Sequence, residues 1–165
     1  MTQSPLVNRA IALSRFDPSP DHRVPRAWLV AVAIVLSVVL CLLADALLVR
    51  IGTAIFPSTK GYTHFQFSDY SKLTVIGIVI AGLGWPVVAR LTSEPRWVFV
   101  RLAVLVTAVL LLPDLYIWLQ GQPGRAVLVL VTLHLAIGLI TYNVLVRLAP
   151  VRSPSGHAAV RGKAA

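Results

Sequence analysis

Charged residues are scarce in this sequence, and acidic residues are the scarcest of all. Asp, Glu, Lys and Arg together make up 13% of the 165 residues, with six acidic side chains against fifteen basic ones. A soluble domain usually carries about 25% charged residues, whereas 57% of this chain is hydrophobic and its mean hydropathy is +0.80. The composition therefore excludes an ordinary soluble domain and indicates a membrane protein.

Sequence motifs for the common catalytic and metal-binding chemistries are also missing. The single cysteine, Cys41, excludes an intrachain disulfide. The sequence has no HExxH or CxxC pattern, no phosphate-binding glycine loop and no nucleophile elbow, and its histidines lack the spacing of metal ligands. Ser153, Ser155 and His157 lie in a polar tail that could not hold the geometry of a catalytic triad. We therefore expect no metal, no cofactor and no enzymatic activity.

Long apolar runs dominate what is present. They cover residues 27–49, 70–91, 98–118 and 126–148. At about 1.5 Å per residue, each run is long enough to cross a hydrocarbon core of about 30 Å as a helix. The sequence predicts an all-α fold: a polytopic membrane protein with one transmembrane bundle of four helices over residues 27–148.

The connector after the first run, residues 52–69, is the longest and is rich in aromatic residues. We expect it to lie at the level of the lipid head groups or to fold over the end of the bundle. Two prolines fall inside later runs: Pro86 is expected to leave the last turn of the second span irregular, and Pro113 to break the hydrogen-bond ladder beside Asp114.

Polar segments rich in arginine and proline flank the apolar runs. Residues 1–26 and 149–165 have no sustained apolar period, so we expect two mobile cytoplasmic tails. Eleven of the fifteen positive residues fall in the two tails and around the connector at 92–96, which predicts that both termini lie in the cytoplasm. The composition is typical of a GC-rich bacterial genome, so the predicted location is the inner (plasma) membrane.

The positive charge is therefore assigned to lipid and not to nucleic acid. Because the basic residues sit beside the spans, and no basic helix or aromatic stacking platform interrupts them, we expect no nucleic-acid binding. The residues expected to fix the topology and to contact lipid head groups are Arg26, Arg50, Arg96, Arg125 and Arg147.

Each apolar run also carries small or polar residues at helical spacing, the pattern expected where helices touch one another. The predicted seam consists of Ala33, Ser37, Cys41, Ala44, Asp45, Thr74, Gly77, Ala81, Gly84, Ala103, Thr107, Asp114, His134, Gly138 and Thr141.

Three ionisable residues of this seam, Asp45, Asp114 and His134, are the candidate site for a proton, a cation or another ligand, because a buried ionisable group is costly in lipid. Structural alternatives remain open for each. Asp114 could pair with Arg125, and Asp45 could pair with Arg50 or lie at the mouth of the bundle. His134 could relay protons, contact a ligand, pair with Asp45, or be a neutral imidazole bonded to a neighbouring helix.

A family resemblance rests on short motifs. The chain has an arginine-rich start, a polar aromatic connector after the first span, Pro113-Asp114 in the third span and Leu133-His134-Leu135 in the fourth. Over residues 27–148 it resembles a family of small bacterial four-span membrane proteins known as a domain of unknown function. The resemblance implies a bundle with a histidine on its last helix, and it implies no activity.

Two functions are compatible with this pattern. The leading hypothesis is a non-enzymatic accessory or scaffold component that binds another membrane protein or a lipid, because the seam is mostly small residues and its polar groups are few. The alternative is a small transporter or channel, working as a homo-oligomer, with Asp45, Asp114 and His134 as a proton or cation path.

Overall fold

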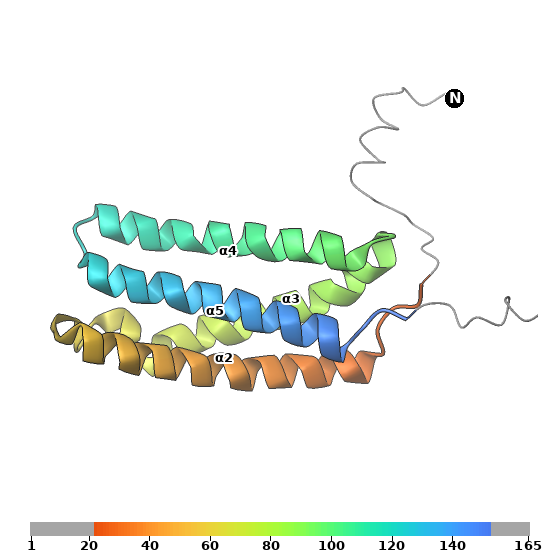
Figure 1. The fold of residues 1–165 in the computed structure, drawn as a ribbon, viewed down its shortest axis with the longest axis horizontal. Coiled ribbons are helices and arrows are strands. Elements are labelled where there is room, and N and C mark those ends of the chain that lie inside the picture. The colour runs from red at the N-terminus through yellow and green to blue at the C-terminus, as the bar shows by residue number, and fades with distance from the viewer. Residues whose placement is uncertain (1–21, 153–165) are drawn as a thin grey trace, which may run out of the picture.

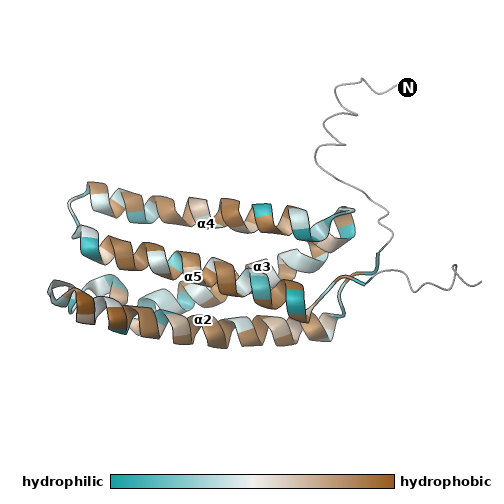
Figure 2. Ribbon diagram, viewed as in Figure 1, coloured by the Kyte–Doolittle hydropathy of each residue, from teal (hydrophilic) through white to brown (hydrophobic). Residues whose placement is uncertain are grey.

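The computed structural model describes residues 22–152, and long helices account for most of them (Figure 1). The helices are α2 (Ala27–Ile55), α3 (Phe67–Leu91), α4 (Pro95–Leu119) and α5 (Gly124–Leu148). All four are long and apolar enough to cross a membrane. Figure 2 shows hydrophobic residues predominating along α2, α4 and α5. The predicted all-α bundle of four transmembrane helices is confirmed.

The helix ends differ from the predicted spans by a few residues, and most at the end of α2. The first apolar run stops before Arg50, but the helix continues to Ile55. Its last turns are held by local hydrogen bonds: the Thr53 hydroxyl donates to Val49 O over 2.9 Å, and Phe56 N donates to Gly52 O over 2.8 Å. Hydropathy marks only the lipid-facing stretch, whereas backbone hydrogen bonding sets where the helix ends.

The two prolines do not interrupt their helices. Pro86 lies inside α3 and Pro113 lies inside α4, and each helix continues beyond its proline. The expected irregular last turn of α3 is therefore wrong, whereas the expected loss of one backbone hydrogen bond beside Asp114 follows from Pro113 itself, without an interruption of α4. A proline removes one backbone donor, and here the turns on either side keep the chain helical.

Helix α5 lies between α2 and α4 and packs along both, while α3 lies behind them in this view and packs mainly along α2 (Figure 1). Two short 3-10 helices, η1 (Pro57–Thr59) and η2 (Thr63–Phe65), connect α2 to α3. They lie at the same end of the bundle as the turn between α4 and α5, and we call this the loop end. The opposite end, which holds the α3–α4 turn and both ends of the described chain, is the termini end.

An aromatic core fills the termini half of the bundle. Trp85 is fully buried, and its indole Nε1 donates a hydrogen bond to Ala149 O over 2.7 Å. Its ring centroid lies 4.9 Å from that of Phe99, which in turn stacks on Tyr142 at 5.9 Å. The buried members of this core are Val30, Ala33, Trp85, Phe99, Leu145, Val146 and Ala149. This half therefore contains an apolar plug.

The chain just outside the helices packs against the termini end. Residues 22 and 23 precede α2, and His22 Nε2 lies 2.7 Å from Ala89 O. Arg23 and Arg152 form an antiparallel bridge through two backbone hydrogen bonds of 2.8 and 3.1 Å. The packed part of the protein therefore extends from residue 22 to residue 152.

The predicted tails, 1–26 and 149–165, thus include residues that belong to the bundle, namely 22–26 and 149–152. The rest of both tails, 1–21 and 153–165, lies outside the described residues. The prediction overlooked the bridge because backbone pairing between distant segments leaves no hydropathy signal.

The predicted seam is correct for α2 and needs correction on α3. On α2 the buried residues include Ala33, Ser37, Cys41 and Asp45, as expected. On α3 the glycines Gly77 and Gly84 have open space where a Cβ would be, whereas a Cβ on Gly82 would overlap the side chain of Ile34. The buried face of α3 is Thr74, Ile78, Gly82, Trp85 and Ala89. This face includes the bulky Trp85. A prediction based on small residues alone therefore chose the wrong face of α3.

Candidate functional site in the loop half of the bundle

Polar side chains from all four helices gather in the loop half of the bundle. Asp45 comes from α2, Thr74 from α3, Asp114 from α4 and His134 from α5. Both carboxylates are buried, with Asp45 at 0% and Asp114 at 5% exposure. The structure therefore brings all three predicted site residues into one region and adds Thr74 to them.

Asp45 is anchored by a hydroxyl group from the neighbouring helix. The Thr74 hydroxyl donates a hydrogen bond of 3.0 Å to Asp45 Oδ2, and Asp45 Oδ1 has no hydrogen-bond partner among the described residues. Arg50 is exposed and forms no ion pair with Asp45 within residues 22–152, so the suggested pairing of these two residues is wrong. The Oδ1 oxygen of this carboxylate can thus accept a hydrogen bond from a donor that the described chain does not supply.

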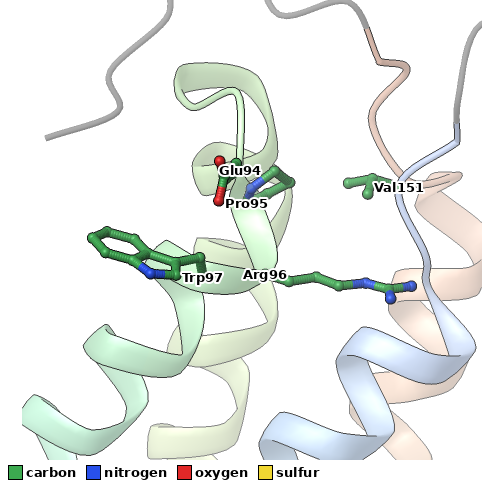
Figure 3. Close-up of a pocket in the computed structure, with 5 residues that line it drawn as sticks. All are labelled: Glu94, Pro95, Arg96, Trp97 and Val151. Atoms are coloured by element: carbon green, nitrogen blue, oxygen red, sulfur yellow. The ribbon is translucent and has the colours of Figure 1, made fainter. Parts of the chain in front are cut away.

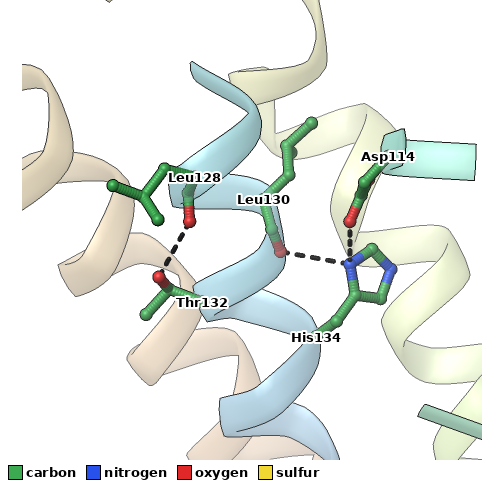
Figure 4. A network of polar contacts seen from close by, with 5 residues as sticks. All are labelled: Asp114, Leu128, Leu130, Thr132 and His134. Carbon is green, nitrogen blue, oxygen red and sulfur yellow. Dashed lines mark hydrogen bonds and ion pairs between the residues drawn. The ribbon is translucent and has the colours of Figure 1, made fainter. Parts of the chain in front are cut away.

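Asp114 meets His134 across the contact between α4 and α5 (Figure 4). His134 Nδ1 lies 2.9 Å from Asp114 Oδ2 and 3.1 Å from Leu130 O, one turn earlier in α5. Because a carbonyl oxygen can only accept, Nδ1 carries a hydrogen. The Asp114 oxygen lacks hydrogen-bond alignment, so the contact with the imidazole is chiefly electrostatic.

In this arrangement the second ring nitrogen of His134, Nε2, is the atom that can be either protonated or unprotonated. The His134 side chain is 27% exposed, against 7% for that of Asp114. With Nδ1 protonated, Nε2 either offers a lone pair or takes up a proton beside a carboxylate. Asp45 also lies within electrostatic range of His134, although His134 contacts Asp114 and not Asp45. Of the possibilities left open for His134, the structure shows a contact with a neighbouring helix.

Arg125 does not neutralise Asp114. Its guanidinium carbon lies 5.7 Å from the ring centroid of Phe56, a cation–π contact between the start of α5 and the end of α2. The predicted pair between Asp114 and Arg125 is therefore wrong. Nine residues separate Arg125 from His134, about 13 Å along a helix, so the arginine sits too near the end of α5 to reach the carboxylate.

The connector between α2 and α3 lies at the loop end beside this site, which fits the expectation that it folds over the end of the bundle, and its position at the lipid head groups stays a prediction. Tyr62 packs edge-on against His64 and Phe65, with ring centroids 5.3 and 5.2 Å apart. Burial, reinforced by the negative charge of Asp114, raises the pKa of Tyr62 above its usual value. The Tyr62 hydroxyl is buried and has no partner among the described residues.

Tyr62 and His64 did not feature in the predicted site. His64 lies within electrostatic range of Asp114, as Tyr62 does. The only sequence signal for them was the unusual number of aromatic residues in a polar connector. That signal placed the segment near the bundle end, but it could not say which side chains approach the carboxylates.

The chemistry that this region can support is proton acceptance and hydrogen bonding. Within residues 22–152 no group of three His, Cys, Asp or Glu side chains converges closely enough to hold a metal ion. Asp45 Oδ1 and the Tyr62 hydroxyl are buried polar atoms that call for a hydrogen-bond partner, such as water or a polar group of a ligand.

The buried side chains of α2 become less polar from this region toward the termini end. Cys41 Sγ lies 3.7 Å from Thr141 Oγ1, and Ser37 comes one turn further along α2. Beyond Ser37 the buried face of α2 consists of Ala33 and Val30, which belong to the aromatic core. The polar site is therefore confined to one half of the described bundle.

These features define the class of protein: a polytopic integral membrane protein built as one bundle of four helices. The chain belongs to the family of unknown function DUF6069, which matches residues 18–150. This confirms the resemblance noted from the sequence. No curated protein and no solved structure matches the chain.

Proposed function

We propose that this protein is a non-enzymatic accessory component that binds another membrane protein through α4. The observation that carries the proposal is how little of α4 is covered. Of its most apolar stretch 11% is buried, compared with 22% to 28% in the other three helices. Its buried residues are Pro95, Phe99 and Asp114. A partner helix on α4 would give it the packing that its own bundle supplies to the other helices.

A groove between α4 and α5 supports this role. Its volume is about 320 Å³, and its lining is almost entirely apolar. The residues along it are Val100, Ala103, Val104, Thr107, Ala108, Leu111, Leu135, Gly138, Leu139 and Tyr142. In a bilayer, lipid tails are as apolar as leucine, so helices associate through close packing beside small residues. A groove with small residues between larger ones fits the side chains of a spanning helix.

Co-purification from native membranes in a mild detergent tests the proposal. We expect a stoichiometric membrane partner with the wild type, and its loss with Ala108→Leu, which fills the groove. Ala31→Leu is the matched control, because Ala31 is an exposed alanine on α2. Retention of the partner by Ala108→Leu, or purification of the wild type alone, would contradict the proposed role of α4.

A second function, a small oligomeric transporter or channel, is favoured by the contact between Asp114 and His134. Against it stands the confinement of the buried ionisable residues Asp45, Asp114 and His134 to the loop half, since a path needs polar groups or water along its whole length. Proton flux into reconstituted vesicles discriminates the two. Flux above that of empty vesicles, lost in both His134→Asn and Asp114→Asn, would overturn the accessory role.

We propose in addition that both termini lie in the cytoplasm, which rests on the positive-inside rule. The described arginines near the termini end are Arg23, Arg26, Arg90, Arg96, Arg101, Arg147 and Arg152, whereas the positive residues toward the loop end are Arg50, Lys60, Lys72 and Arg125. Cysteines introduced at positions 60 and 122 should react with an impermeant reagent from outside the cell. Reaction at position 94 from outside would refute the orientation.

A further inference from the structure

The termini end carries an excess of positive charge that its described acidic residues do not balance. Among residues 22–152, Glu94 is the acidic residue at this end, against the arginines named above. The loop end is different, because there the exposed positive residues are fewer and two carboxylates lie buried nearby. An unbalanced cationic surface at the membrane boundary attracts anionic lipid.

Two of these arginines are held opposite each other by the backbone. The bridge between Arg23 and Arg152 makes them neighbours across an antiparallel pair. Like charges in directly opposed positions destabilise such a pair. The Nε atom of Arg152 is also buried and lacks a hydrogen-bond partner in the described part of the chain. An anion near this pair would offset the repulsion between the two charges.

A pocket of about 290 Å³ lies next to this bridge, between the start of α4 and the segment that follows α5 (Figure 3). Arg96 extends from α4 toward the segment of Val151, which adjoins Arg152 in the chain. Glu94 and Trp97 line the other side of the pocket, away from the Arg96 guanidinium. The first turn of a long helix such as α4 also presents backbone N–H groups and the positive end of its dipole.

We propose that this pocket binds the phosphate of an anionic phospholipid head group, held by Arg96, with the positive charge of Arg152 next to the pocket as a second attraction. Guanidinium groups match phosphate because their parallel N–H donors bind two oxygens at once. The lipid is the favoured source of the phosphate because the site lies where the apolar helices begin. Val151 offers a contact for the start of an acyl chain. This site is separate from the α4 groove and does not depend on the proposed partner.

The test uses the full chain, purified in mild detergent and then exchanged into nanodiscs or mixed micelles. Added phosphatidylglycerol should raise the thermal unfolding midpoint, and about one molecule should remain bound in native mass spectrometry, whereas phosphatidylcholine should do neither. In Arg96→Gln and Arg152→Gln, the concentration of phosphatidylglycerol needed for half of the midpoint shift should rise about tenfold, the loss of one charge-assisted contact. Lys60→Gln is the control, since Lys60 is an exposed cation at the loop end, and it should behave as the wild type.

Three outcomes would overturn the proposal. One is an equal loss in Lys60→Gln, which would mean general attraction to a cationic surface. Another is protection by inorganic phosphate equal to that by the lipid, which would mean a free-anion site. The third is unchanged lipid retention in both pocket variants. Should a glutamine variant fold poorly, Arg96→Lys keeps the charge without the paired donors, and its retention should fall between wild type and Arg96→Gln.

Discussion

The termini half and the loop half of the bundle bury different kinds of side chains. In the termini half, Trp85 and Phe99 pack on α5 within an apolar core. In the loop half, Asp45 and Asp114 are buried with one hydroxyl group and one imidazole as their partners. The same four helices therefore build a close-packed plug at one end and a sparsely satisfied polar site at the other.

The difference bears on how stability and function divide between the halves. Within a bilayer, burying apolar surface against another helix gains nothing from the hydrophobic effect, so dense packing around large rings holds the termini half together. Interhelical polar contacts are weaker, on average about 0.6 kcal/mol each. We therefore expect the termini half to provide most of the stability, which leaves the loop half able to carry polar groups for binding.

The largest effect is expected from Trp85→Ala. The substitution empties the centre of the aromatic core and removes the hydrogen bond to Ala149 O. Substitutions of this size in a core cost about 3 to 5 kcal/mol, to be measured by unfolding in detergent. Trp28→Ala is the control, since Trp28 is 59% exposed. Equal losses of unfolding free energy in the two variants would show that the aromatic core of the termini half does not provide the stability assigned to it.

A smaller effect is expected where α2 approaches α5 in the loop half. A Cβ on Gly52 would come within 2.6 Å of Val129 Cγ2, and the branched valine has little freedom to move away. Gly52→Ala should cost about 1 to 3 kcal/mol through overpacking. Gly77→Ala meets nothing within 4 Å and should leave stability unchanged or higher. Tolerance of Gly52→Ala in the same unfolding assay would mean that the loop half is loosely packed.

A coupling of about 1 kcal/mol is expected between Asp114 and His134. A double-mutant cycle with Asp114→Asn and His134→Asn measures it, because each change removes the ionisable group and keeps a polar side chain. Unfolding of the wild type, both single variants and the double variant gives the coupling free energy. Strictly additive effects would show that the 2.9 Å contact contributes nothing to stability.

The smallest effect is expected for Arg125→Ala, which removes the cation–π contact with Phe56. An exposed contact of this kind contributes about 0.5 to 1 kcal/mol. Arg50→Ala removes an exposed arginine near the same end and serves as the control. A loss comparable to that of Trp85→Ala would place the main stabilising contacts at the loop end and reverse the comparison.

Much of the fold could be read from the sequence because its determinants are local. A chain inside a bilayer must satisfy its backbone hydrogen bonds within each span, so an apolar run of sufficient length becomes a helix. The four helices and their succession follow from that requirement alone. The buried face of α2 was also predictable, because its small and polar residues share one side of the helix.

The partners of the ionisable residues could not be read in this way. Which side chains meet depends on how each helix is rotated about its axis and on how it crosses its neighbours. Hydropathy does not fix these angles, since lipid accepts any apolar face. In the structure α3 places Trp85 and Thr74 on its buried face, so that Thr74 reaches Asp45, while Gly77 and Gly84 have open space beside them.

The sequence by itself therefore determined the membrane class, the four spans, and the candidate trio of Asp45, Asp114 and His134. Only the tertiary structure decided that Asp114 meets His134 and that Arg125 lies over Phe56. Only there does the aromatic connector take its place at the loop end beside the polar site. The physical reason is range: backbone hydrogen bonds and hydropathy act within a segment, whereas these contacts arise from packing between helices far apart in the chain.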